Sequence, residues 1–186
     1  MANMSPDTPE PVGATNDKVP FQSKVRQLAA ARHAITLGQI TGIMMRSSQH
    51  RFAFLADLEW LVLPALASNQ FVIHETLDKA SGRKMPAAYI LWAMVSPEID
   101  ARLCSNPSFR ARLKPDEWTS GSIPWLMDVA GNPRLTELLI KTLVERRFEA
   151  TGIKTYSRGQ DGKPIAGVLR ATGIAEAAEP SEVRKG

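Results

Sequence analysis

Two polar side chains in this chain could act together as a general base and its orienting partner. His50 follows a helix-like run that ends near Arg46, and Asp128 lies near the end of an apolar, strand-like run that begins at Ile123. A neutral imidazole accepts a proton near pH 7, and a carboxylate can hold the other ring nitrogen and stabilise the imidazolium that forms. Such a pair is suited to removing a proton from a nucleophile.

Each of these residues also has a purely structural interpretation. His50 could satisfy carbonyl groups at the end of the preceding helix, and Asp128 could cap the helix that follows it. Ser47 lies one helical turn before His50, so its hydroxyl can bond near the same imidazole or play a structural part. No metal-ligand spacing is present, and Cys104 has no histidine at the spacing of a cysteine nucleophile.

The elements around the pair follow from hydrophobic periodicity. Residues 23–46 and 55–68 show helical spacing, with glycines in the first run and Pro64 expected to kink the second. Residues 70–75 and 87–95 are expected to form a hairpin, and the second strand is apolar enough to lie centrally. A short helix opened by Ser96 follows.

The second half of the chain completes an α+β pattern. Residues 123–130 are expected to form a third strand and residues 133–148 an amphipathic helix. Residues 153–156 and 165–169 bracket a turn rich in glycine, which predicts a closing hairpin. Helices packed on an antiparallel or mixed central sheet are the natural arrangement for this order of elements.

Composition sets the bounds of the molecule. The chain has 186 residues, of which 44% are hydrophobic and 23% charged, with a formal net charge of +4. We expect a disordered N-terminal tail over residues 1–22, one domain over residues 23–170 and a flexible C-terminal tail over residues 171–186. A single cysteine, no signal peptide and no apolar run of about 18 residues predict a cytoplasmic protein without a transmembrane segment.

Several segments resemble the toxin-activating lysine acyltransferases, the family that activates RTX hemolysins and adenylate cyclase toxins. They occur in the family's order over roughly residues 35–150. The segments are Leu37–Ile40, Met44–Arg51, Asp57–Ala65, Asn69–Phe71, Leu91–Ala93, Ser96–Glu98, Pro115–Gly121 and Trp125–Ala130.

The resemblance implies both a fold and a reaction. The fold is that of GNAT-class acetyltransferases, and the reaction moves a fatty acyl chain from acyl carrier protein to internal lysines of an inactive RTX-type protoxin. The family's catalytic histidine and aspartate fall on His50 and Asp128, and its active-site serine falls on Ser47. The donor is then the phosphopantetheine-linked chain of the carrier protein, with no tightly bound cofactor. Some members form dimers, so a homodimer is expected.

Basic residues could dock the acidic carrier protein, although scattered solvated charges would give the same composition. The docking candidates are Arg46, Arg51, Arg102, Arg110, Arg112 and Lys114. A nucleic-acid partner is not expected, because the charge is modest and no stacking motif is evident.

The chain departs from the family pattern at two places. The family usually has Ser-Pro-Leu-His where this chain has Ser-Ser-Gln-His at 47–50, and an Ala-Pro-Phe-Gly-like turn where this chain has Ala-Gly-Asn-Pro at 130–133. Two other functions therefore remain open. One is a small-acyl N-acetyltransferase that uses coenzyme A, although its usual glycine-containing pyrophosphate loop is lacking. The other is a non-catalytic adaptor that only binds its partner.

Overall fold

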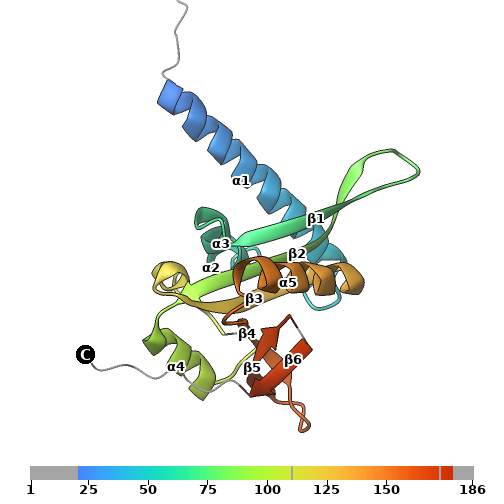
Figure 1. Cartoon of the computed structure of the whole chain (residues 1–186). Coiled ribbons are helices and arrows are strands. Elements are labelled where there is room, and N and C mark those ends of the chain that lie inside the picture. Colours follow the sequence, from blue (N-terminus) through green and yellow to red (C-terminus); the bar gives the residue numbers. More distant parts are fainter. Residues whose placement is uncertain (1–20, 110, 172, 178–186) are drawn as a thin grey trace, which may run out of the picture.

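A mixed sheet flanked by helices forms the body of the protein in the computed structural model, which describes residues 21–109, 111–171 and 173–177 (Figure 1). The helices are α1 (Phe21–Arg46), α2 (Asp57–Leu61), α3 (Leu63–Ala67), α4 (Pro97–Ser105), the 3-10 helix η1 (Pro115–Thr119) and α5 (Pro133–Arg147). The strands are β1 (Phe71–Leu77), β2 (Lys84–Val95), β3 (Ile123–Gly131), β4 (Ile153–Arg158), β5 (Pro164–Arg170) and β6 (Gly173–Ala177).

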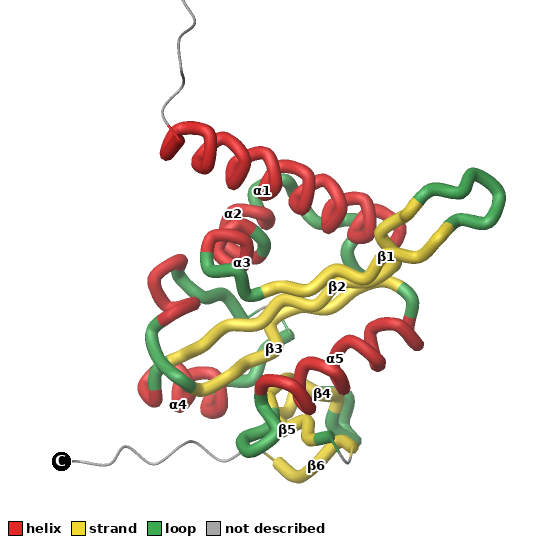
Figure 2. Tube along the Cα trace, turned by 45° about the horizontal axis from the view of Figure 1, so that its top comes forward, coloured by secondary structure: helices red, strands yellow, loops and turns green. Residues whose placement is uncertain are grey.

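Within the described ranges the strands form one six-stranded sheet in the order β1-β2-β3-β4-β5-β6. Neighbouring strands are antiparallel, except β3 and β4, which are parallel and joined through α5. The structure confirms the predicted α+β class and is consistent with the GNAT-like arrangement. Helices α1, α2 and α3 lie on one side of the β1–β2–β3 region and α5 on the other (Figure 2).

Strand β2 is buried on both faces, as its almost continuous apolar sequence predicts. Tyr89, Leu91 and Ala93 face the cluster formed with α1, α2 and α3, whereas Ala88, Ile90 and Trp92 face the cluster formed with α5. The alternation follows from the two-residue period of a strand. The side chains from Ala88 to Ala93 are therefore held by packing against a helix layer, which makes this part of β2 a rigid support.

The first two predicted helices are not interrupted at the places that their glycine and proline residues suggested. Helix α1 runs without interruption through Gly38 and Gly42, which have open space around them apart from a distant Arg46 side chain. The second helical run is divided into α2 and α3, and Pro64 lies in the first turn of α3, where its missing N–H costs nothing. The polar connection around residues 115–119 forms η1.

A β-bulge interrupts the pairing of β2 with β3. Leu91 is paired with Asp128, but the next residue, Trp92, is paired with Leu126, so Met127 is an extra residue on β3. An extra residue resets the alternation of side chains along the strand. As a result Asp128 and Ala130 lie on the α1 side of the sheet with Trp125, instead of on the α5 side with Leu126.

Strands β3 and β4 pair at one position, Trp125 opposite Lys154. A buried polar cluster stands at this junction. The ammonium of Lys154 lies 2.8 Å from both carboxylate oxygens of Asp100, which is completely buried, and the indole N–H of Trp125 donates to the same carboxylate at 2.8 Å. The paired charges tie α4 to the sheet at the point from which β3 and β4 diverge.

The C-terminal boundary differs from the expected one. Strand β6 lies inside the stretch 171–186 that was expected to be a flexible tail, and it continues the sheet by pairing with β5. The open edge of β5 provides unpaired backbone groups, and this drives the additional pairing even for a small-residue segment. Residues 178–186 and most of the expected N-terminal tail, residues 1–20, lie outside the described residues.

Gly131 occupies a position that no larger residue can take without strain. Its φ is +119°, and a Cβ there would fall on the backbone of Ala87 and Ala88 in β2. We expect Gly131→Ala to lower the free energy of unfolding by about 2–5 kcal/mol, measured by denaturant unfolding. Gly38→Ala is the matched control, because no atom lies within 4 Å of its Cβ position and alanine favours a helix by up to about 1 kcal/mol. An equal change in the free energy of unfolding for Gly131→Ala and Gly38→Ala would contradict this prediction.

Candidate active site

Ser47 and His50 lie on a turn that continues α1 beyond Arg46. The backbone N–H groups of His50 and Arg51 donate to the Ser47 carbonyl at 3.2 and 2.9 Å. Residues three apart on such a turn lie on the same side. The Ser47 hydroxyl is accordingly 2.9 Å from Nδ1 of His50, while the two intervening residues, Ser48 and Gln49, are exposed.

The other ring nitrogen of His50 meets Asp128. Nε2 is 2.8 Å from Oδ1 of Asp128, and the two side chains are only 14% and 12% exposed. An ionised carboxylate can only accept a hydrogen bond, so in the neutral imidazole the proton stands on Nε2. Nδ1 then has a free lone pair, which accepts the hydrogen of the Ser47 hydroxyl. The structure thus brings Ser47, His50 and Asp128 into one hydrogen-bonded chain.

A third side chain, Tyr89 on β2, completes the surroundings of Asp128. Its hydroxyl donates to Oδ2 of Asp128 at 2.6 Å, and Tyr89 is fully buried. Both carboxylate oxygens of Asp128 therefore have a donor. This contact was not foreseen from the sequence. The available signal was a lone phenol in an otherwise apolar central strand, because a buried tyrosine hydroxyl usually finds a partner.

The local charges favour a protonatable imidazole. The hydrogen bond with Asp128 raises the pKa of His50 above its ordinary value of 6.5, the negative charge of Asp128 adds to this, and partial burial acts in the opposite direction. Burial raises the pKa of Tyr89, and the charge of Asp128 and its hydrogen bond add to that effect. The phenol consequently remains a hydrogen-bond donor across the accessible pH range.

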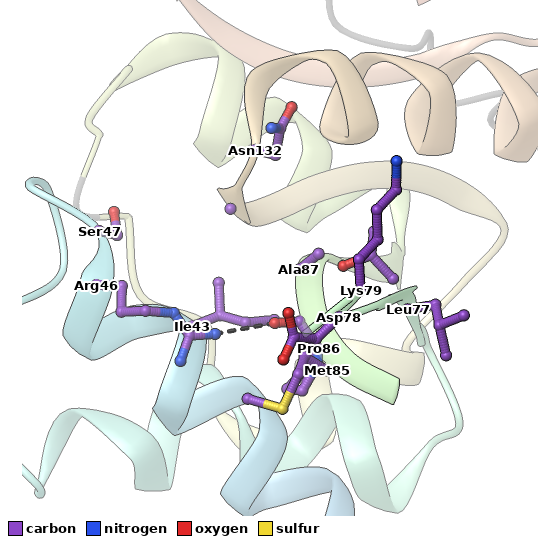
Figure 3. Close-up of a pocket in the computed structure, with 12 residues that line it drawn as sticks. Ile43, Arg46, Ser47, Leu77, Asp78, Lys79, Met85, Pro86, Ala87 and Asn132 are labelled. Atoms are coloured by element: carbon purple, nitrogen blue, oxygen red, sulfur yellow. Dashed lines mark hydrogen bonds between the residues drawn. The ribbon is translucent and has the colours of Figure 1, made fainter. Parts of the chain in front are cut away.

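A pocket of about 740 Å³ lies next to this chain of hydrogen bonds (Figure 3). Its walls come from the end of α1, from the β1–β2 hairpin and from the turn between β3 and α5. Ser47 is one of the lining residues, together with apolar side chains such as Ile43, Leu77 and Met85. Ser47 is therefore the member of the hydrogen-bonded chain that the pocket touches, whereas His50 and Asp128 are not among its lining residues.

The basic residues considered for docking are placed very differently. Arg46 is exposed, lines the pocket and donates to the Pro86 carbonyl at 2.9 Å, and the Arg51 guanidinium lies over the ring of Phe52. Both are close in sequence to His50. Of this group, these two lie beside the site.

The remaining candidates already have partners or lie elsewhere. Arg102 forms two hydrogen bonds with Glu117, at 2.8 and 2.7 Å, at the far end of β2 from the pocket. Arg112 bonds Asp57 at 3.3 Å and lies over the ring of Trp60. Lys114 precedes η1 and is exposed, and Arg110 lies outside the described residues.

In the turn after Asp128, the backbone N–H groups at the start of α5 are already hydrogen-bonded. Asn132 caps the helix by accepting from the Arg134 N–H at 3.0 Å through its side chain, and its carbonyl accepts from Leu135 and Thr136 at 3.0 and 2.9 Å. Pro133 has no N–H. The altered Ala-Gly-Asn-Pro turn is therefore a closed helix cap that passes closely against β2.

Neither a metal centre nor a membrane span is evident in the part of the chain that the structure describes. No group of three or more His, Cys, Asp or Glu side chains within it could hold a metal ion. None of its helices combines the length and apolarity needed to cross a bilayer.

Comparison with known proteins places the chain in a family. Residues 29–171 match the family model described as the RTX toxin acyltransferase family. The chain is 32% identical over 122 residues to the leukotoxin-activating lysine-acyltransferase LktC of Pasteurella haemolytica-like sp. (strain 5943B), a match that covers 66% of this chain and 64% of that protein. It is 29% identical over 110 residues to the RTX-II toxin-activating lysine-acyltransferase ApxIIC of Actinobacillus pleuropneumoniae, covering 59% and 63%.

Only part of each relative's sequence aligns with this chain. The match spans between about half and slightly less than two thirds of the length of the curated relatives. The family model covers most of the described domain, including His50, Tyr89 and Asp128. On the strength of that family model, the chain belongs to the RTX toxin acyltransferase family.

Proposed function

We propose that this protein transfers a fatty acyl chain from acyl carrier protein to internal lysines of an RTX-type protoxin, with His50 as general base and Asp128 as its partner. The observation that carries the proposal is the orientation of His50. Its Nε2 is bound by Asp128, and its Nδ1 lies against Ser47, which lines the pocket. The relatives named as toxin-activating lysine-acyltransferases support the same reaction.

The base is needed because a lysine side chain is a poor nucleophile near neutral pH. Its reference pKa of about 10.4 leaves roughly one molecule in a thousand unprotonated, which costs on the order of 4–5 kcal/mol. In the proposed reaction the amine attacks the thioester carbonyl, a C–N bond forms and the C–S bond breaks. Nδ1 of His50 accepts the proton that the attacking nitrogen loses, and the imidazolium then gives that proton to the departing thiolate, so the free imidazole is restored.

Ser47 can take part without changing this balance. Its oxygen can accept a hydrogen from the amine while its own hydrogen passes to Nδ1, which lies 2.9 Å away. Asp128 stabilises the imidazolium during the transfer, because the carboxylate is already in contact with the opposite side of the ring. The proton thus passes from the amine, directly or through the Ser47 hydroxyl, to His50, where Asp128 stabilises the imidazolium.

The start of α5 favours a carrier protein over coenzyme A as donor. Coenzyme A is usually held by its pyrophosphate on free N–H groups at a helix N-terminus. Here the N–H groups of residues 134–136 are bound by Asn132, and residue 133 is a proline. A phosphopantetheine arm on a carrier protein lacks the pyrophosphate and needs no such cradle.

The carrier protein would then be held largely by charge. Arg46 and Arg51 are the exposed cations beside the site, and acyl carrier proteins are acidic. We place the reaction in the cytoplasm, because the free thiol of Cys104 suits a reducing compartment. Docking through exposed charges also predicts that raising the ionic strength weakens the donor interaction.

The experiment compares donors with one acceptor. Acyl carrier protein and coenzyme A carrying the same fatty acyl chain are each incubated with the protein and a protoxin that contains glycine- and aspartate-rich nonapeptide repeats, and acylated lysines are measured by mass spectrometry. We expect a kcat/KM at least about 100-fold higher with acyl carrier protein, because each unsatisfied pyrophosphate contact costs more than 1 kcal/mol.

The other outcomes distinguish the remaining functions. Equal or faster transfer from acyl coenzyme A would identify a coenzyme A-dependent acyltransferase. Binding of the protoxin without transfer from either donor would identify a non-catalytic adaptor.

A further inference from the structure

We propose that Tyr89 is a positioning residue that locks the Asp128 carboxylate and thereby holds His50 with its proton on Nε2 and its lone pair on Nδ1. This inference rests on the proposed roles of His50 and Asp128. Tyr89 does not touch the pocket, since it is fully buried and is not among the pocket's lining residues. The Tyr89 hydroxyl contacts Asp128, so its influence on acyl transfer would pass through that carboxylate.

The contact has the geometry of a strong hydrogen bond. The distance of 2.6 Å between the Tyr89 hydroxyl and Oδ2 of Asp128 falls in the range of charge-assisted O–H···O⁻ bonds. The second oxygen, Oδ1, is bound by His50 at 2.8 Å. A carboxylate fixed through both oxygens cannot rotate, so the direction in which it offers Oδ1 to the imidazole is set by Tyr89.

The fold explains why this tyrosine can act as a fixed point. Tyr89 lies opposite Ala130 in the regular part of the β2–β3 register, and Asp128 is two residues along β3 from Ala130, so Tyr89 and Asp128 share a face. Side chains separated by this diagonal spacing are within reach of an aromatic residue. The ring is packed in the core formed with α1, α2 and α3, which leaves the hydroxyl no freedom to move away.

Removing the hydroxyl should alter His50 in a defined direction. Without the donor at Oδ2, more negative charge is available at Oδ1, so the imidazolium is stabilised further and the pKa of His50 rises. The carboxylate also gains rotational freedom, which reduces the fraction of molecules with His50 aligned. Of the charged groups near this contact, Arg46 is engaged with the Pro86 carbonyl, and Glu75 on β1 bonds Gln39 of α1. Asp128 is therefore the charge through which Tyr89 acts on His50.

The test uses the full chain with Tyr89→Phe and a matched control. Tyr156→Phe removes the other tyrosine hydroxyl, which is 3.0 Å from the backbone carbonyl of Leu103 and away from the site. We expect Tyr89→Phe to lower kcat about tenfold with little change in KM, and to raise the pKa of His50 measured by NMR titration of the three histidines. Tyr156→Phe should leave kcat and the pKa of His50 unchanged.

Fluorination provides a second route if Tyr89→Phe fails to fold. In the Tyr156→Phe background Tyr89 is the remaining tyrosine, so 3-fluorotyrosine incorporation makes its hydroxyl more acidic without removing it. A stronger donor at Oδ2 should lower the pKa of His50, opposite to the effect of phenylalanine.

An unchanged pKa of His50 in both Tyr89 variants would overturn the proposal and leave Tyr89 with a packing role. The titration needs no substrate, so it gives this answer even if His50→Ala retains transfer activity and the proposed function fails.

Discussion

Replacing His50 with alanine is expected to lower the rate of acyl transfer by about 10²–10⁴-fold, the range that a positioned general base contributes. The change removes the imidazole whose Nδ1 lies 2.9 Å from the Ser47 hydroxyl, while the arginines proposed to dock the carrier protein are left intact. KM for the acyl donor should therefore change little. The measurement is kcat with saturating acyl carrier protein and a fixed protoxin, together with far-UV circular dichroism to show that the fold is retained.

The pH dependence of the wild-type transfer rate provides a second test of the role of His50. The imidazole must be neutral to accept a proton, so the rate falls as the pH is lowered through the pKa of His50. Because Asp128 raises that pKa, the midpoint of this limb should lie above 6.5. His33→Ala, on the first half of α1, is the matched control and should leave both the rate and the midpoint unchanged. Full activity of His50→Ala would remove the general base from the mechanism.

Replacing Asp128 with asparagine is expected to reduce the rate by about 10²–10⁴-fold with almost no change of shape, by analogy with the effect of the same change in a serine-protease triad. The amide oxygen can still accept from Tyr89, which turns the amide NH₂ toward Nε2 of His50. Nε2 must then accept a hydrogen bond, so the proton moves to Nδ1. The nitrogen that faces Ser47 and the pocket would carry a proton and could no longer receive one.

The Asp128→Asn substitution should also change the pKa of His50, which can be measured independently of the rate. Both effects that raise the pKa of His50 come from Asp128, so in Asp128→Asn the pKa should fall below its wild-type value. NMR titration measures this without substrate. Asp161→Asn, in the exposed β4–β5 turn, is the matched control for loss of a carboxylate. A normal rate with a lowered pKa of His50 would show that the tautomer does not matter for transfer.

The two departures from the family pattern have different consequences in the fold. Ser48 and Gln49 are exposed and leave the Ser47–His50 contact intact. The turn at 130–133, in contrast, closes the start of α5 and requires Gly131 for its close passage along β2. The difference at 48–49 alters the surface beside the site. The difference at 130–133 alters which backbone N–H groups at the start of α5 are open to a ligand.

Much of the local structure follows from the sequence alone. The helix ending near Arg46 places Ser47 and His50 on one turn, because residues three apart on a helical turn share a side. The apolar run 87–95 becomes a central strand, because it offers no polar face to solvent. Ser96 caps the helix that follows it, because its side chain accepts a backbone N–H group. Each of these features depends on neighbours within a few positions.

The tertiary structure decided what these local elements could not. Whether Asp128 faces α1 or α5 depends on the extra residue Met127, and this bulge arises only when β3 pairs with β2. Tyr89 meets Asp128, and Arg102 is occupied by Glu117, for the same reason: the partners are distant in sequence and approach through packing. Side chains alternate along an isolated strand with a period of two, so a shift of one residue, set by a neighbouring strand, determines which face carries the carboxylate.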